Sequence, residues 1–347
     1  MVLACLPLMA TAAKTDRIGL VEQPVPVSDN IVESCATMSW MQLSQMLLQL
    51  TGDTKYADDM ERLMINHVFA SQDVQTGSCR YHTAPNGMKP DGYFHGPDCC
   101  TASGHRIISL LPTFFYAEKG HDFYVNQYID AEYDGKDFGF LVTGNYPEGE
   151  TVTITIAKAA SKTLHLRLPS WCDQPEISAG GGTYEGQSGY VTINRKWKQG
   201  DVITVHLPMK EQWVMREHHS DYPSYNLPGG EIMYREEPAK QIPYAFLRGP
   251  VVYCLDMVWN PGLYNDDVDI AHDIKIDVTK LPVKIVNGEW SNRKLISAAY
   301  HAEADYMGRS VTLTLTPFAG IGQWWREGMQ KPALGSRAFS YAIWMNK

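Results

Sequence analysis

Residues 34–52 read SCATMSWMQLSQMLLQLTG, and this stretch makes the N-terminal part of the chain helical. Its apolar side chains recur at spacings of three and four residues, which places them on one face of an α-helix. They are Met38, Met41, Leu43, Met46, Leu47 and Leu50. Gly52 stands where a residue in the left-handed conformation commonly ends a helix. We therefore predict a helix over residues 34–50.

Two further helices are predicted after this one. Thr54 is a suitable N-cap for a helix that runs to about Ser71, and the short joint makes this helix antiparallel to the first. A loop rich in glycine, proline and aspartate occupies residues 72–98. A third apolar helix is expected over residues 103–116, with a bend at Pro112.

After Gly120 the apolar pattern changes to a period of two, which is typical of β-strands. The clearest strands are residues 123–128, 151–156, 163–168, 190–193, 202–207, 251–255 and 310–315. Short strands at this spacing favour β-sandwiches. We therefore predict an α+β multidomain chain, with a helical portion over residues 1–118, a first β-sandwich over residues 119–213 and a second over residues 214–336.

Composition narrows the class of ligand. The chain has 347 residues and a formal net charge of −9, so it lacks the positive field that nucleic acid or an anionic membrane surface requires. No run of about 18 apolar residues predicts a transmembrane helix. Residues 1–13 fit either a secretion signal or a buried helix, which leaves a cytoplasmic and a periplasmic or secreted location both open. The 19 tyrosines and nine tryptophans are compatible with a sugar ligand.

Metal-binding side chains gather in the helical portion. Glu33 and Cys35 precede the first helix, where extended chain lets positions i and i+2 face one side. Cys79 lies in the loop, and the pair Cys99 and Cys100 precedes the third helix. Three thiolates and one carboxylate would suit tetrahedral zinc. The pair could equally be a coincidence or a vicinal disulfide, and Glu33 could be a first-turn acid that interacts with the helix dipole.

Polar aromatic residues in the 72–98 loop are candidates for binding a substrate. They include Tyr81, His82 and His95, which lie close in sequence to the cysteine pair. Such residues line sites on loops, although a surface position is the alternative.

At these motifs the sequence resembles glycoside hydrolase family 127, formerly a domain of unknown function. The resemblance rests on Glu33-Ser-Cys-Ala-Thr-Met-Ser-Trp40, on residues 50–62, on Asn66-His67 and on Cys99-Cys-Thr-Ala-Ser-Gly-His-Arg106. Leu247-Arg-Gly-Pro-Val-Val-Tyr253 is similar to the β-domain of the family. The similarity extends from about residue 30 to at least residue 255.

The resemblance implies a retaining exo-glycosidase of the β-L-arabinofuranosidase type. Its substrate would be an L-arabinofuranose-containing glycan or a related small glycoside. The family pattern implies zinc held by Glu33, Cys35, Cys99 and Cys100, with Cys99 as the nucleophile and Cys100 as a ligand alone. It also implies that residues 337–347 return as a strand of the first β-sandwich.

The sequence departs from the family before residue 33. The acid/base glutamate of the family lacks an aligned counterpart here, and Glu22, 11 residues before Glu33, is the nearest candidate. The family has an (α/α)6 barrel, an alpha/alpha toroid, whereas three helices and a fourth candidate over residues 2–12 would make a partial barrel remnant.

We therefore expect weak or absent activity from this chain alone. Apolar stripes left exposed, such as Met38, Leu47 and Leu110, would favour a homo-oligomer or aggregation. The alternatives are a non-catalytic zinc-stabilised carbohydrate-binding or interaction protein, and a thiol redox protein based on Cys99 and Cys100.

Overall fold

The computed structural model describes most of the chain from residue 33 onward. Complete residues are described over 33–72, 77–81, 83, 98–215, 244–260, 262–263, 273–285, 298–321, 341–343, 345 and 347. Backbone alone is described at residues 14–15, 21–22, 86–88, 261 and 340. The candidate helix over residues 2–12 lies outside these ranges.

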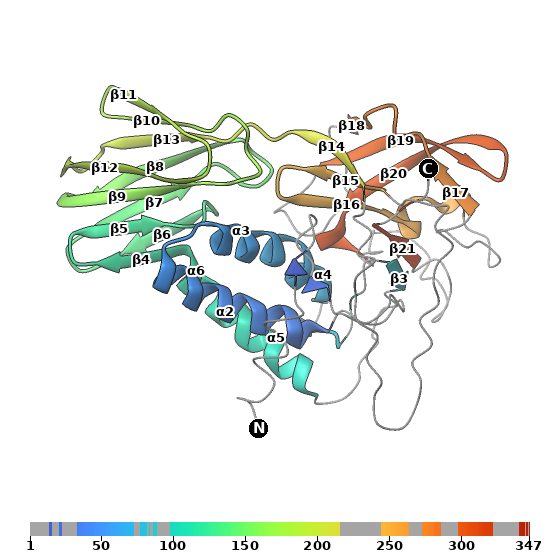
Figure 1. Ribbon diagram of the computed structural model, residues 1–347, viewed down its shortest axis with the longest axis horizontal. Helices are drawn as coiled ribbons and strands as arrows, with labels where there is room; N and C mark the ends of the chain where they lie inside the picture. Colours follow the sequence, from blue (N-terminus) through green and yellow to red (C-terminus); the bar gives the residue numbers. More distant parts are fainter. Residues whose placement is uncertain are drawn as a thin grey trace.

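The helical layer confirms the predicted pair of antiparallel helices (Figure 1). Helix α2 spans Ser34–Thr51 and ends at Gly52, whose φ of 69° is the left-handed conformation that glycine adopts easily. Helix α3 spans Lys55–Arg62 and continues without a break as the π-helix η1, Leu63–Val68, and as α4, Phe69–Ser71.

The third helix begins earlier than predicted. Helix α5 spans Cys99–Leu110, and α6, Pro112–Phe115, follows after an interruption at the expected proline. The start moves to Cys99 because the side chain of Asp98 accepts a hydrogen bond from the backbone N–H of Thr101, at 2.7 Å. Both cysteines of the pair therefore lie in the first turn of a helix.

Two sheets follow the helices. The first has the order β11-β10-β13-β8-β7-β6 and the second has the order β12-β9-β5-β4. The strands of the first are Glu176–Ala179 (β10), Gly182–Glu185 (β11), Val202–His206 (β13), Thr151–Lys158 (β8), Gly139–Thr143 (β7) and Ala131–Asp134 (β6). Those of the second are Gly189–Trp197 (β12), Ala160–Leu168 (β9), Asp122–Val125 (β5) and Tyr116–Lys119 (β4). The sheets contact each other through aromatic rings, since the ring of Phe123 lies 5.5 Å from that of Phe140.

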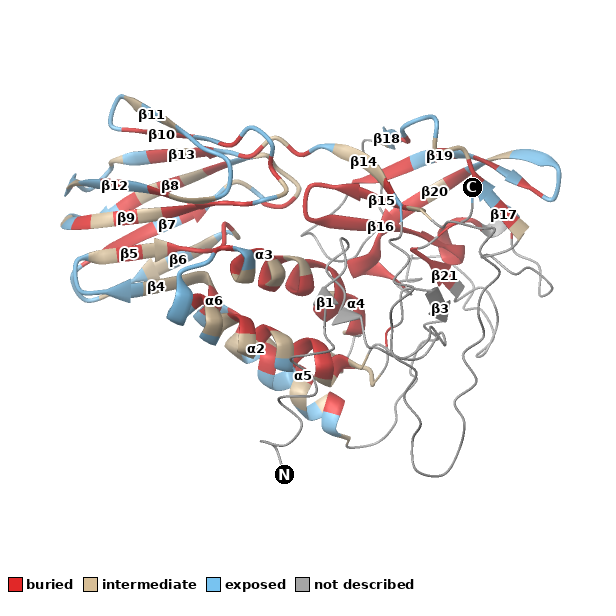
Figure 2. Cartoon of the chain, in the orientation of Figure 1, coloured by how far each residue is buried: buried red, intermediate tan, exposed pale blue. Residues whose placement is uncertain are grey.

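A third sheet of nine strands occupies the C-terminal part of the chain. Its main path runs Glu211–Met215 (β14), Tyr244–Arg248 (β15), Val251–Asp256 (β16), Arg309–Pro317 (β20), Ala299–Tyr306 (β19) and Ile274–Ile276 (β17). Val283–Ile285 (β18), Ser340–Ala342 (β21) and Asn86–Met88 (β3) pair beside it. Three 3-10 turns, Met257–Trp259 (η2), Pro261–Leu263 (η3) and Phe318–Gly320 (η4), adjoin these strands. Strand β16 is buried along its entire length (Figure 2).

The final segment corrects one prediction. β21 pairs with β16 of the third sheet, so the expected return of residues 337–347 to the first β-sandwich is wrong for the residues described. The physical reason is packing: Tyr341 and Ile343 are buried in one apolar cluster with Val252 and Phe318. Alternating apolar residues specify a strand, whereas the available apolar surface selects its partner.

The expected apolar stripe is also only partly exposed. Met38 is buried, and Leu47 and Leu110 are intermediate in exposure. Met46 and Leu50, at 59% and 80% exposed, are the apolar residues of α2 that face outward. Self-association stays a prediction.

Within the described part of the chain, no helix has the length and apolar character needed to cross a membrane.

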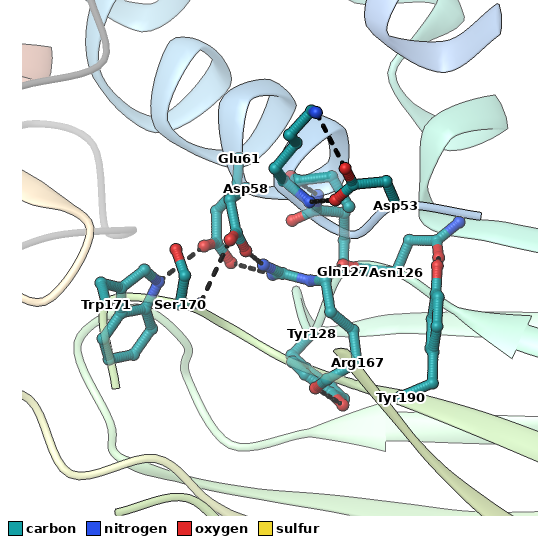
Figure 3. Close-up of polar contacts among 12 residues, drawn as sticks. Asp53, Asp58, Glu61, Asn126, Gln127, Tyr128, Arg167, Ser170, Trp171 and Tyr190 are labelled. Atoms are coloured by element: carbon teal, nitrogen blue, oxygen red, sulfur yellow. Dashed lines mark hydrogen bonds and ion pairs between the residues drawn. The ribbon is translucent and has the colours of Figure 1, made fainter. Parts of the chain in front are cut away.

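A buried ionic cluster joins the helical layer to the sheet β12-β9-β5-β4 (Figure 3). Arg167 of β9 is completely buried and forms ion pairs with Asp58 and Glu61 of α3. Its Nε donates to the carbonyl oxygen of Asn126, at 2.6 Å, and Trp171 donates to Glu61, at 2.8 Å. Burial alone would lower the pKa of Arg167, but the two carboxylates raise it well above its usual value. We call these residues the Arg167 joint.

Candidate metal and catalytic site

Three thiols meet where the first turns of α2 and α5 lie side by side. The Sγ atoms of Cys35, Cys99 and Cys100 all lie within 4.8 Å of one another. The backbone N–H of Cys35 points at the Sγ of Cys100, at 3.4 Å, so the start of α2 contacts the start of α5 directly. The structure therefore brings together the cysteines that the sequence predicted as one site. We call this group the thiol site.

The three thiols differ in exposure. Cys100 is buried completely, Cys35 is half-buried and Cys99 is exposed. A ligand without a chemical role needs no access to solvent, whereas a nucleophile must reach its substrate. The exposure pattern therefore agrees with different roles for the two neighbouring cysteines.

The loop segment before the cysteine pair is attached to the start of α2. The backbone N–H of Ser34 donates to the carbonyl oxygen of Tyr81, at 2.9 Å, and its hydroxyl donates to the carbonyl oxygen of Arg80, at 2.6 Å. These bonds hold Tyr81 beside the thiols. The charge of Glu33, followed by that of Cys99 and a hydrogen bond with its thiol, raises the pKa of Tyr81 to about 12. Tyr81 therefore stays protonated and able to donate.

Each thiol has a hydrogen-bonding partner of its own. Cys100 receives the N–H of Cys35, Cys99 interacts with Tyr81, and the thiol of Cys35 contacts the hydroxyl of Ser103, at 3.5 Å. Burial raises the pKa of Cys35, against the lowering effect of Ser103. Burial likewise raises the pKa of Cys100. A side-chain hydrogen bond with the Cys35 thiol adds to this, whereas the backbone N–H of Cys35 opposes it. In the metal-free protein these two thiols are thus held in their neutral form.

Ser103 was missed from the sequence, although a signal was available. It follows Cys99 by four residues and Cys100 by three, and side chains at these spacings share one face of a helix. The motif that contains it was recognised for its cysteines alone.

Helix α5 lies very close to Cys79 at the position of Gly104. A Cβ atom at this position would lie 2.3 Å from both the Cβ and the Sγ of Cys79. Cys79 also accepts a hydrogen bond at its carbonyl oxygen from the hydroxyl of Thr101, at 3.3 Å. Cys79 is buried and lies outside the group of converging thiols, so its position behind α5 is one of packing.

The π-helix η1 contacts the start of α2 through His67. His67 is buried, and its Nδ1 and Nε2 lie 2.9 Å from the hydroxyl of Thr37 and the carbonyl oxygen of Thr83, respectively. His67 therefore connects the first turn of α2 to the segment that follows Tyr81. Single π-helical turns inside α-helices are frequent at functional sites.

The other predicted site residues are placed only in part. Glu33 is the N-cap of α2, and its carboxylate is not among the ligand atoms that converge within 4.8 Å in the described part of the chain. Glu22 lies in β2 (Val21–Glu22), whose backbone pairs with β1 (Lys14–Thr15), but its side chain is outside what is described. His82 and His95 also lie outside the described residues.

The thiol site fits zinc better than a hard cation. Zn–S bonds of about 2.3 Å in a tetrahedron place sulfur atoms roughly 3.8 Å apart. The three Sγ atoms lie within 4.8 Å of one another, which exceeds this spacing by at most about 1 Å. Soft thiolate ligands disfavour Mg²⁺ and Ca²⁺. A carboxylate or water oxygen can complete the tetrahedron.

Residues 21–113 match the family model described as "Beta-L-arabinofuranosidase, GH127 catalytic domain", and residues 122–209 match the corresponding GH127 middle domain. A non-reducing end β-L-arabinofuranosidase of Bifidobacterium longum subsp. longum is 25% identical over 262 residues, which cover 66% of this chain and 36% of that protein. A match to a catalytic domain does not favour the non-catalytic alternative.

Two solved structures share the fold. One is a GH127 β-arabinofuranosidase with a TM-score of 0.68 at 23% identity, covering 96% of this chain and 54% of that one. The other is a GH127 β-L-arabinofuranosidase from Geobacillus stearothermophilus T6, with a TM-score of 0.69 at 20% identity, covering 97% and 55%. The chain thus spans about a third of the curated relative and just over half of these structures.

Proposed function

Since the chain is a GH127-like protein, we propose that it is a glycoside hydrolase that acts on β-L-arabinofuranosides through the thiolate of Cys99. One observation carries this proposal: three thiols converge at two helix starts, and one of the three is exposed. The relatives named above, described as β-L-arabinofuranosidases, support the substrate class.

Cys35, Cys99, Cys100 and Glu33 are the residues proposed to hold zinc. When bound, the metal would keep the thiols deprotonated at neutral pH, where burial otherwise keeps two of them neutral. Glu33 is the N-cap of α2, two residues before Cys35, and it would supply the carboxylate of this ligand set. Buried Cys100 serves as a ligand and takes no further part.

Cys99 is the proposed nucleophile. Its sulfur attacks the anomeric carbon, the C–S bond forms, and the bond to the leaving oxygen breaks. A water molecule then displaces the sulfur at the same carbon, so that two inversions retain the configuration. Tyr81 lies beside Cys99 and keeps its proton, so its hydroxyl can donate to the sugar ring or to the departing thiolate.

A carboxylic acid must protonate the leaving oxygen and later remove a proton from water. We propose Glu22 for this role, supported by its place upstream of Glu33 within the segment that matches the catalytic domain. His82 and His95 are proposed, with Tyr81, to bind the sugar, because they share the loop that leads to the cysteine pair.

The test compares two cysteine variants of the reduced, zinc-loaded protein. Release of an aryl group from an aryl β-L-arabinofuranoside is measured, and NMR identifies the anomer first formed. Release by the wild-type chain alone is expected to be weak. Cys99→Ser should abolish this release, whereas Cys172→Ser, at a buried thiol outside the site, should leave it unchanged. Wild-type turnover by Cys99→Ser, or an inverted product, would contradict the proposal.

A further inference from the structure

Ser103 stands on the same face of α5 as the cysteine pair, and its hydroxyl reaches across to α2. We propose that Ser103 is a positioning residue that fixes the Cys35 thiolate for metal binding, an inference that rests on the proposed function. The Ser103 hydroxyl would form a hydrogen bond with a zinc ligand and would not bind the zinc itself.

The contacts of Ser103 distinguish it from an ordinary serine inside a helix. Such a serine usually bonds back to the carbonyl oxygen four residues earlier. Ser109 of the same helix does so, since its hydroxyl donates to the carbonyl oxygen of His105, at 2.9 Å. The hydroxyl of Ser103 instead contacts the Cys35 thiol and accepts from the guanidinium of Arg106, each at 3.5 Å.

The Cys35 thiol donates to the Ser103 oxygen, and this bond would reverse its direction once the sulfur is a metal-bound thiolate. Arg106 occupies an acceptor position on the Ser103 oxygen, which leaves the hydroxyl hydrogen for a neighbouring acceptor. When Cys35 loses its proton, its sulfur becomes that acceptor. The hydrogen bond then stabilises the charged sulfur.

The hydrogen bond between Ser103 and Cys35 matters because the proposed metal site carries excess negative charge. Three thiolates and one carboxylate around a divalent cation leave a net charge of −2 in a partly buried place. Outer donors offset such an excess and fix the orientation of the ligands. Cys100 has a backbone donor and Cys99 has Tyr81, so Ser103 completes the set with Cys35.

The bond also joins two segments far apart in the sequence. Cys35 and Ser103 are 68 residues apart, and they connect the first turn of α2 to the second turn of α5. Loss of the hydroxyl should therefore release the Cys35 rotamer and leave the other ligands unchanged.

The experiment measures zinc affinity by competition with a chromophoric chelator. Ser103→Ala should weaken zinc about 10- to 100-fold, the range seen when an outer hydrogen bond to a metal ligand is removed. Ser103→Thr keeps a hydroxyl and should restore most of the affinity. Ser109→Ala, the matched control in the same helix, should bind as the wild type does.

A second readout separates positioning from loss of packing. In the Co²⁺-loaded protein, the thiolate-to-cobalt absorption band should move to longer wavelength in Ser103→Ala, because a thiolate without its donor gives up an electron more easily. The band should return in Ser103→Thr. Equal melting temperatures of the metal-free proteins would show that the fold is unaffected.

The outcomes are distinct. Stoichiometric zinc in the wild type with unchanged affinity in Ser103→Ala would overturn the inference and leave the proposed function standing. A wild type that binds no zinc would overturn both. A loss of affinity shared by Ser103→Thr would assign the effect to packing and overturn the positioning role.

Discussion

The Arg167 joint and the thiol site are two polar clusters of the helical layer, and they balance their charges differently. In the joint, two buried carboxylates share one buried guanidinium, and tyrosine, tryptophan and backbone groups satisfy the remaining positions. In the thiol site, three acidic groups converge, and Arg106 reaches them through Ser103. The joint is complete from the chain's own residues, whereas the thiol site is a donor set that we propose to hold a cation.

Removing a thiol from the thiol site should give the largest effect on stability. It tests whether this site needs a bound cation. Structural zinc sites have apparent binding free energies of about 10–16 kcal/mol near neutral pH. Cys100→Ala should therefore lose zinc and its thermal stabilisation, measured as metal content after dialysis and as melting temperature with and without zinc. Cys172→Ala, which removes a buried thiol elsewhere, should keep one equivalent. Less than one equivalent in the wild type would break the comparison.

Removing the buried guanidinium of Arg167 tests whether the Arg167 joint depends on its own positive charge. Arg167→Met leaves Asp58 and Glu61 buried without a counter-charge, so it should lower the free energy of unfolding by about 3–5 kcal/mol in a urea titration. Arg195→Met is the matched control, because the pair of Arg195 with Asp201 is partly exposed and should contribute at most about 1 kcal/mol. Equal losses in the two variants would show that burial does not set the strength of the joint.

A change at Gly104 separates packing from ligation. Alanine favours a helix by about 1 kcal/mol over glycine, but its Cβ would collide with Cys79. Overpacking of this kind costs about 1–3 kcal/mol, so Gly104→Ala should be destabilised and should bind zinc less tightly. Gly262→Ala meets no atom within 4 Å and should unfold like the wild type. A stabilised Gly104→Ala would contradict the close approach of α5.

The smallest effect concerns a thiol outside both clusters. Burial raises the pKa of Cys172 to about 11, so the neutral thiol predominates below that pH, and the reactive thiolate increases as the pH approaches 11. Iodoacetamide should label exposed Cys99 in the metal-free protein at pH 8 and leave Cys172 unlabelled, as peptide mass mapping would show. Rapid labelling of Cys172 in the folded protein at pH 8 would contradict its burial.

Local patterns predicted most of the elements. Spacings of three and four located α2 and α3, and the period of two located strands such as β8, β9 and β20. The third helix was placed too late because the cap at Asp98 lies before its apolar residues begin. The partner of β21 was wrong because pairing depends on apolar surface supplied by residues far away in the sequence.

The site was predictable where residue type and motif carried the chemistry. Cys35, Cys99 and Cys100 were assigned to one site because they precede two predicted helices and because their motifs resemble those of the family. The Arg167 joint gave no such signal, because Arg167 is 109 residues from Asp58 and each residue is ordinary by itself. Contacts of this kind arise only when the layers come together.

The contacts of Asn66 in η1 can form only after most of the chain has been synthesised. Its amide donates to the carbonyl oxygen of Pro250, 184 residues later, and its side-chain oxygen accepts from the N–H of Val252. A ribosome that adds 5–20 residues per second needs roughly 10–40 s to reach that partner. During this time the Asn66 side chain lacks its partners at Pro250 and Val252. The contacts of the helical layer with the third sheet can therefore be completed only after about 250 residues have been synthesised.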